Sequence, residues 1–153
     1  MAYRRPSRAQ ALWWGMLGGA GFAFAEGLFN GNLAVGELSW GLLAPMRFGT
    51  TILHCATGAL MGLGWYALLR HRRILQWLKY YLTSVVLHAV WNAVGLGWTF
   101  AAPEFVPDSV PAVAGAFVPL VLIALLLIEA LAMLYMLIRL VRNTEPAGAM
   151  EAQ

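Results

Sequence analysis

This chain has 153 residues, of which 61% are hydrophobic and only 11% are charged, and its formal net charge is +3. A soluble domain of this size has about 25% charged residues, so the composition excludes an ordinary soluble domain and predicts a protein solvated by lipid. The net positive charge suggests contact with anionic lipid headgroups and requires no nucleic-acid partner. The single cysteine, Cys55, excludes an internal disulfide.

Four apolar stretches follow one another along the chain, at about residues 11–31, 47–69, 80–101 and 111–138. Each reaches the ~20 residues that an α-helix needs to cross ~30 Å of hydrocarbon. We therefore predict an all-α, polytopic membrane protein in which residues 1–142 form one domain of four transmembrane helices. The segments 31–45 and 102–111 are expected to be outer loops, and residues 143–153 a short polar tail.

Basic residues are distributed unevenly around these stretches. Nine of the ten lie before the first stretch, between the second and third, or after the fourth: Arg4, Arg5, Arg8, Arg70, Arg72, Arg73, Lys79, Arg139 and Arg142. The other two connections carry the acids Glu37, Glu104 and Asp108. Because basic residues mark the cytoplasmic side, we predict a multi-pass protein of a cell membrane, a bacterial inner membrane or a plasma membrane, with both termini cytoplasmic.

The N-terminus has a second interpretation. Its basic residues, its apolar run and the small residues Ala23 and Ala25 resemble a secretory signal that is cleaved before Glu26. Cleavage after Ala25 would remove the first span. Four glycines between residues 15 and 21 make this run a poor signal core, which favours the transmembrane interpretation.

Small residues spaced by four occur in the first two stretches, as Gly15 and Gly19, as Gly27 and Gly31, and as Gly58 and Gly62. Such pairs allow membrane helices to approach each other closely. We therefore expect these glycines at helix–helix contacts.

Polar residues lie deep inside the first three stretches, namely Glu26, His54, His88 and Asn92. Each shares one helical face with other small or polar residues, as expected for positions that face the interior of a bundle. At ~1.5 Å per residue, their depths overlap in the outer half of the bilayer. Since intramembrane ionisable groups are functional candidates by default, we predict that they meet in a chemical or ion-handling site. The alternative is a hydrogen-bonded cluster that only fixes helix register.

Three motifs give the chain a family resemblance. The run GMLGGAGFAFAEGLFNG at 15–31 resembles the Gly-x-Gly-Phe-Ala-x-x-Glu-Asn motif of the PrsW-type intramembrane proteases, which belong to the wider group containing the CAAX prenyl proteases. The run RFGTTILHCATGALMG at 47–62 is similar to their second motif, an arginine followed seven residues later by a histidine. The run LHAVWNAVG at 87–95 is similar to the third, His-Ala-Leu-x-Asn.

This resemblance implies an intramembrane endopeptidase that hydrolyses peptide bonds of a membrane protein or peptide, in or near the lipid bilayer. Glu26 and His54 are implied to activate a water molecule, and His88 and Asn92 to stabilise the oxyanion. Arg47, at the outer end of the second stretch, is implied to bind substrate. The site is either of glutamic type or metal-dependent. In a metal-dependent site, Glu26, His54 and His88 are the expected ligands of a divalent ion such as zinc.

The sequence also departs from the family pattern. Gly27 stands where the family has asparagine, and Asn30 where a tyrosine is usual. The family's Glu-Glu-x-x-Lys motif, on an upstream helix, has no counterpart in this sequence, so the resemblance covers only the C-terminal half of the family core. The alternative prediction is therefore a catalytically inactive binding subunit or scaffold. A partner subunit or a homo-oligomer that completes the site is a further expectation.

Overall fold

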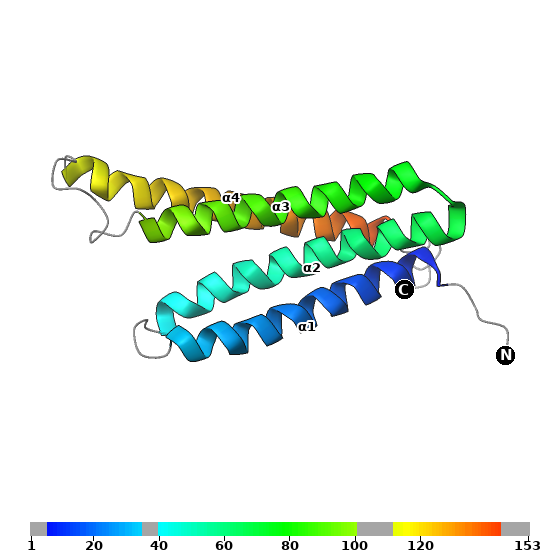
Figure 1. Ribbon diagram of the computed structural model, residues 1–153, viewed down its shortest axis with the longest axis horizontal. Helices are drawn as coiled ribbons and strands as arrows, with labels where there is room; N and C mark the ends of the chain where they lie inside the picture. Colours follow the sequence, from blue (N-terminus) through cyan, green and yellow to red (C-terminus); the bar gives the residue numbers. More distant parts are fainter. Residues whose placement is uncertain (1–5, 35–39, 101–111, 145–153) are drawn as a thin grey trace, which may run out of the picture.

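The computed structural model describes residues 6–34, 40–100 and 112–144, and the side chains of 6–29, 47–97 and 117–144. Successive helices run in opposite directions, so that α1 begins and α4 ends at the same end of the bundle (Figure 1). The helices are α1 (Arg8–Ala34), α2 (Trp40–His71), α3 (Ile74–Phe100) and α4 (Ala112–Arg142). Every element in the described part of the chain is a helix, which confirms the all-α prediction.

Two connections differ from the prediction because the helices extend beyond their apolar stretches. Helix α2 begins at Trp40, so the later part of the expected outer loop 31–45 is helical. Helix α3 begins at Ile74 instead of about residue 80. The thickness of the hydrocarbon layer limits the length of the apolar stretch but not the length of the helix. In addition, the leucine, glutamine and lysine residues at the start of α3 have high helix propensities. The expected loop 102–111 and most of the polar tail lie outside the described residues.

The connection between α2 and α3 is consequently a tight turn at Arg72 and Arg73. Arg72 has a φ of 54°, and its N–H donates to the carbonyl oxygen of Leu68 at 3.0 Å. This is the left-handed helix cap in which glycine is the usual residue. The turn places the end of α2 beside the start of α3.

Helices α1 and α2 touch through their backbones at the glycines that the sequence singled out. A Cβ atom at Gly15 would overlap with the carbonyl group of Gly58, and one at Gly62 with that of Ala11. At Gly19, it would overlap with the carbonyl group of His54. The prediction of a helix–helix contact is confirmed for Gly15, Gly19, Gly58 and Gly62. It is wrong for Gly27, where an added Cβ would have no neighbour within 4 Å. The contact lies at the level of the candidate site residue His54.

The hydrophobic core is centred on α2. The largest fully buried side chains are Leu12 of α1, Leu53 and Leu63 of α2, and Met133 of α4. Helix α3 covers this core with partly buried side chains that include Leu87. Helix α1 packs on α2, while α4 packs on α2 and α3.

Within the described residues, two helical segments are long and apolar enough to cross a membrane, Arg47–His71 and Phe117–Arg142. In the first, 56% of the most apolar part is buried inside the molecule, whereas in the second only 6% is buried. A helix that is apolar on all sides and yet unburied needs an apolar environment around it. The α4 segment therefore supports a membrane environment for this bundle.

Candidate functional site

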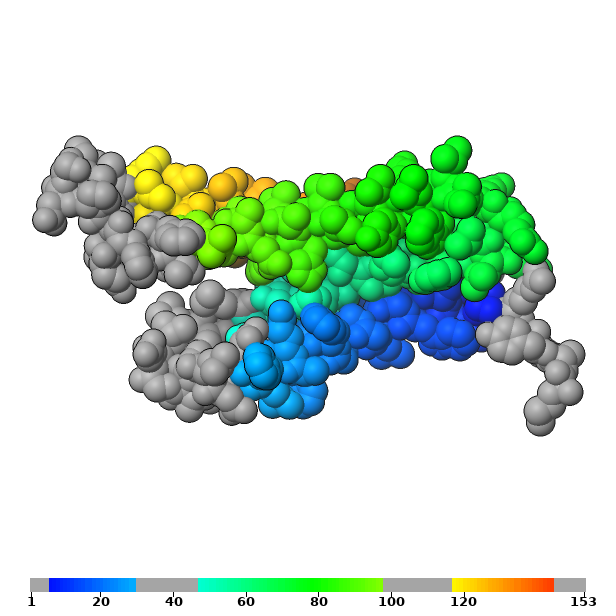
Figure 2. All heavy atoms as spheres, in the orientation of Figure 1, coloured from blue at the N-terminus to red at the C-terminus, as the bar shows by residue number. Residues whose placement is uncertain are grey.

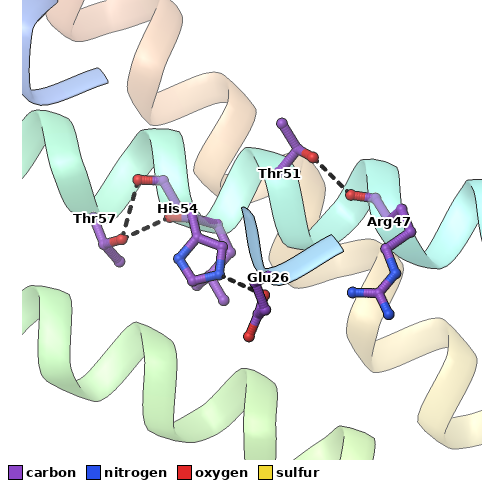
Figure 3. A network of polar contacts seen from close by, with 6 residues as sticks. Glu26, Arg47, Thr51, His54 and Thr57 are labelled. Carbon is purple, nitrogen blue, oxygen red and sulfur yellow. Dashed lines mark hydrogen bonds and ion pairs between the residues drawn. The ribbon is translucent and has the colours of Figure 1, made fainter. Parts of the chain in front are cut away.

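Glu26 of α1 and His54 of α2 form the centre of a polar cluster (Figure 3). Oε2 of Glu26 lies 3.0 Å from Nε2 of His54. The side chain of His54 is 6% exposed and that of Glu26 is 30% exposed, so the pair lies at the edge of the packed interior. A carboxylate oxygen accepts hydrogen bonds, so in this contact Nε2–H of His54 is the donor and Oε2 of Glu26 is the acceptor.

Two further rings hold the imidazole of His54 in place. Phe22 of α1 meets it with a centroid distance of 4.8 Å and an interplanar angle of 61°. His88 of α3 meets it at 5.2 Å and 64°. Both are edge-to-face contacts, a favourable arrangement for aromatic rings. Three helices therefore each supply one ionisable group to the same place, as the sequence predicted for Glu26, His54 and His88.

The direction of side chains on antiparallel helices explains how Glu26 reaches His54. The backbone of His54 is opposite Gly19, about two turns before Glu26 on α1. In an α-helix, each Cα–Cβ bond tilts toward the N-terminus of its helix. Because α1 and α2 run in opposite directions, the side chains of Glu26 and His54 lean toward each other and close this offset.

A second polar contact joins α2 to α3 beside the cluster. Oγ of Ser84 lies 3.2 Å from the carbonyl oxygen of Thr57 and 3.0 Å from that of Tyr80 in its own helix. Ser84 is buried and lies one helical turn before His88. Its contact with α2 thus helps to set the level at which His88 meets His54. Ser84 precedes His88 by four residues, so helical periodicity puts both on one face. No residue pattern indicates Thr57, whose hydroxyl bonds to its own helix.

Replacing Ser84 by alanine is expected to lower the free energy of unfolding by about 0.5–1 kcal/mol, the usual contribution of a hydrogen bond between membrane helices. The matched control is Thr83→Ala, because the Thr83 hydroxyl donates only within its own helix, to the carbonyl oxygen of Lys79 at 2.8 Å. Chemical denaturation of both variants in the same detergent gives the comparison. Equal losses in the two variants would contradict a positioning role for Ser84.

Asn92 and Arg47 lie outside the direct contacts of the cluster. Asn92 follows His88 by one turn on α3, and its side chain is exposed. Arg47 lies two turns before His54 on α2, and its carbonyl oxygen accepts a hydrogen bond from Oγ1 of Thr51 at 2.8 Å (Figure 3). Within the described residues, neither side chain has a hydrogen bond or ion pair with the cluster.

The cluster is accessible from outside the bundle. Glu26 and His88 are half-buried, while Asn92 is exposed. Figure 2 shows a face of the molecule on which α2 lies between α1 and α3. Because 30% of the Glu26 side chain is exposed, a molecule outside the bundle can reach its carboxylate.

A metal site was the second chemical prediction for these residues. Among the residues that the structure describes, no group of three His, Cys, Asp or Glu side chains is placed to hold a metal ion. Nε2 of His54 faces Glu26, and the imidazoles of His54 and His88 meet edge to face. Metal binding by Glu26, His54 and His88 stays a prediction.

Glu129 of α4 is a second carboxylate within an apolar helix. Both of its oxygens are buried and lack a hydrogen-bond partner within the described residues. No hydrogen bond joins it to the Glu26 cluster within the described residues, and Arg139, further along α4, lies over the ring of Tyr135 at 5.8 Å. Glu129 therefore serves as a matched control for Glu26.

Comparisons with known proteins do not identify a relative. The chain matches no model of a protein family, no curated protein and no solved structure. Its likeness to the PrsW-type proteases thus rests on the three sequence motifs, and its function has to be argued from the Glu26 cluster.

Proposed function

We propose that this chain is an intramembrane endopeptidase of PrsW-like type, which hydrolyses peptide bonds in or near the membrane. The observation that carries the proposal is the 3.0 Å contact between Glu26 Oε2 and His54 Nε2, with the ring of His88 beside it. A carboxylate oriented by a buried imidazole and open on its other side is the arrangement of a general base.

In this mechanism, Glu26 removes a proton from a water molecule that attacks the carbonyl carbon of the scissile peptide bond. His54 holds Oε2 of Glu26 and leaves Oε1 for the water. The new C–O bond forms a tetrahedral intermediate, and the proton held by Glu26 passes to the amine nitrogen as the C–N bond breaks. General acid–base catalysis of this kind contributes about 10²–10⁴-fold to the rate.

His88 and Asn92 are the proposed donors to the oxyanion of that intermediate. They lie one turn apart on α3 and therefore share a face. Hydrogen bonds to a developing oxyanion are strong where water is excluded. Arg47, nearer the start of α2, is proposed to bind the substrate chain outside the cluster.

The membrane arrangement proposed here has all four helices crossing a cell membrane, with both termini in the cytoplasm. It is supported by basic residues at the bundle end where α1 and α3 begin and α2 and α4 end, among them Arg8, Arg73 and Arg142. Glu26 and His54 then lie in the outer half of the bilayer. Access from the side of the bundle would let a membrane-embedded peptide reach them.

A catalytically inactive binding subunit or scaffold is the second candidate. It is favoured by the position of Asn92, which is exposed and makes no contact with Glu26 or His54. Glu26 is also the single carboxylate of the cluster within the described residues. A partner subunit or a second copy of this chain would then complete the site.

The test is cleavage of fluorophore- and quencher-labelled transmembrane peptides of mixed sequence by the purified chain in lipid nanodiscs. The proposal predicts cleavage by the wild type and, for His88→Ala, a kcat lower by about 10–10³-fold, the cost of losing an oxyanion donor. Peptide binding without cleavage would overturn the endopeptidase and support the binding subunit. Loss of cleavage on chelation, restored by zinc, would assign the metal-dependent form.

A further inference from the structure

A small polar pocket lies where α1 begins, α2 ends and α3 begins. Its volume is about 270 Å³. Its polar lining comes from three helices and the turn between two of them: Arg8, Tyr66, His71, Arg73, Gln76 and Tyr80. All of these side chains can donate hydrogen bonds, and two of them are permanently positive. The pocket is therefore built to receive an acceptor with negative charge.

No described acidic residue neutralises this pocket. The carboxylates in the described part of the chain are Glu26 and Glu129, and neither lines it. The first turns of α1 and α3 contain no acidic residue either. Two of the three helix ends at the pocket, the N-terminal ends of α1 and α3, are partially positive. Arg8 and Arg73 therefore lie in a positive environment that only the partially negative C-terminal end of α2 offsets. An external anion would offset this positive charge.

A phosphate group matches the chemistry of the lining. The planar guanidinium of arginine binds phosphate oxygens through two parallel hydrogen bonds. The tyrosine hydroxyl and the glutamine amide groups can donate hydrogen bonds to the remaining phosphate oxygens. With Arg8 on α1 and Arg73 in the turn before α3, one phosphate would link these two elements across the end of α2.

An apolar groove beside the pocket indicates where the rest of the ligand lies. The groove has a volume of about 810 Å³ and runs between α1 and α2, where its lining includes Trp14, Gly15, Gly62 and Trp65. Tyr66 lines both the groove and the polar pocket. Apart from Arg70 and Arg72, the lining of the groove is mainly apolar, so an acyl chain can occupy it, whereas free phosphate would leave its apolar part unused.

We propose that the pocket binds the phosphate of an anionic phospholipid whose acyl chain lies in the groove between α1 and α2. The proposal rests on the membrane arrangement given above but not on peptidase activity. It makes one end of the bundle a specific lipid site and not only a surface with diffuse positive charge.

The test is native mass spectrometry of the purified chain in a neutral detergent, titrated with phosphatidylglycerol, with phosphatidylcholine or with inorganic phosphate. The proposal predicts that phosphatidylglycerol binds at least tenfold more tightly than phosphatidylcholine. The double variant Arg8→Gln/Arg73→Gln should weaken phosphatidylglycerol binding by about tenfold or more, since each charge-assisted hydrogen bond is strong. Millimolar inorganic phosphate should not displace the lipid.

The control variant is Arg139→Gln/Arg142→Gln, which removes the same charge from the same end of the bundle but lines neither cavity. Its affinity for phosphatidylglycerol should stay within about threefold of the wild type, because only a diffuse and screened attraction is lost. Equal weakening by both double variants would overturn the site. Displacement by inorganic phosphate would assign the pocket to a free phosphate. Incorporation of all variants into nanodiscs shows separately that the membrane arrangement is intact.

Discussion

Replacing Glu26 by glutamine is expected to lower kcat for cleavage of a transmembrane peptide by about a thousandfold, within the range found for general acid–base groups. Glutamine has nearly the size of glutamate, and its carbonyl oxygen still accepts the hydrogen bond from Nε2 of His54. It has no carboxylate to take a proton from water. The fold and the contact with His54 should therefore persist while the chemical step is lost.

The control for this prediction is Glu129→Gln. Glu129 is also a carboxylate within an apolar helix, but within the described residues its oxygens have no hydrogen-bond partner and so make no hydrogen bond to His54. Its replacement should leave kcat within a factor of about three of the wild type, since it removes no proton acceptor from the reaction. A Glu26→Gln variant that cleaves as fast as Glu129→Gln would exclude Glu26 as the general base.

Replacing Gly19 by alanine is expected to lower the free energy of unfolding by about 2–3 kcal/mol, in the range for overpacked interiors. The added Cβ would overlap with the carbonyl group of His54, which belongs to a helix backbone and cannot rotate away. Helices α1 and α2 must then separate at the level of the cluster. We also expect cleavage to slow, although Gly19 touches no substrate, because the separation moves Glu26 away from His54.

Gly18 provides the control one residue away. A Cβ at Gly18 has no neighbour within 4 Å. Gly18→Ala should therefore be neutral or raise stability by about 0.5–1 kcal/mol, the gain expected when alanine replaces glycine in a helix. Denaturation of both variants in one detergent gives the difference. Equal stabilities would show that the contact between α1 and α2 does not depend on the absence of a side chain at Gly19.

The sequence was sufficient to predict those contacts between helices that depend on the spacing of residues along the chain. The glycines at 15, 19, 58 and 62 lie where α1 and α2 touch, and Glu26, His54 and His88 meet at one place. Both results follow from helical periodicity, which depends only on residue number and type. The roles of these residues in catalysis remain proposals that the cleavage experiments test.

The sequence was not sufficient for features set by side-chain direction and by helix length. Asn92 shares a helical face with His88, yet its side chain is exposed. One face of a helix is wide, so a neighbouring helix can cover part of that face and leave the rest open. Helices α2 and α3 begin before their apolar stretches, because the thickness of the hydrocarbon limits the apolar length but not the helix length. The hydroxyl of Ser84 donates a hydrogen bond to the backbone carbonyl oxygen of Thr57. A pattern of side chains in the sequence cannot indicate a backbone acceptor.

The most direct measurement of the central claim is the NMR signal of His54 in ¹⁵N-histidine-labelled protein in lipid. The chain has three histidines, so His54 is assigned by comparison with a His54→Asn variant. A hydrogen bond from Nε2–H to Glu26 predicts a protected, downfield-shifted proton on Nε2 that changes in Glu26→Gln and persists in Glu129→Gln. A His54 signal that exchanges freely with water, or that Glu26→Gln leaves unchanged, would contradict the claim that these two residues form one site.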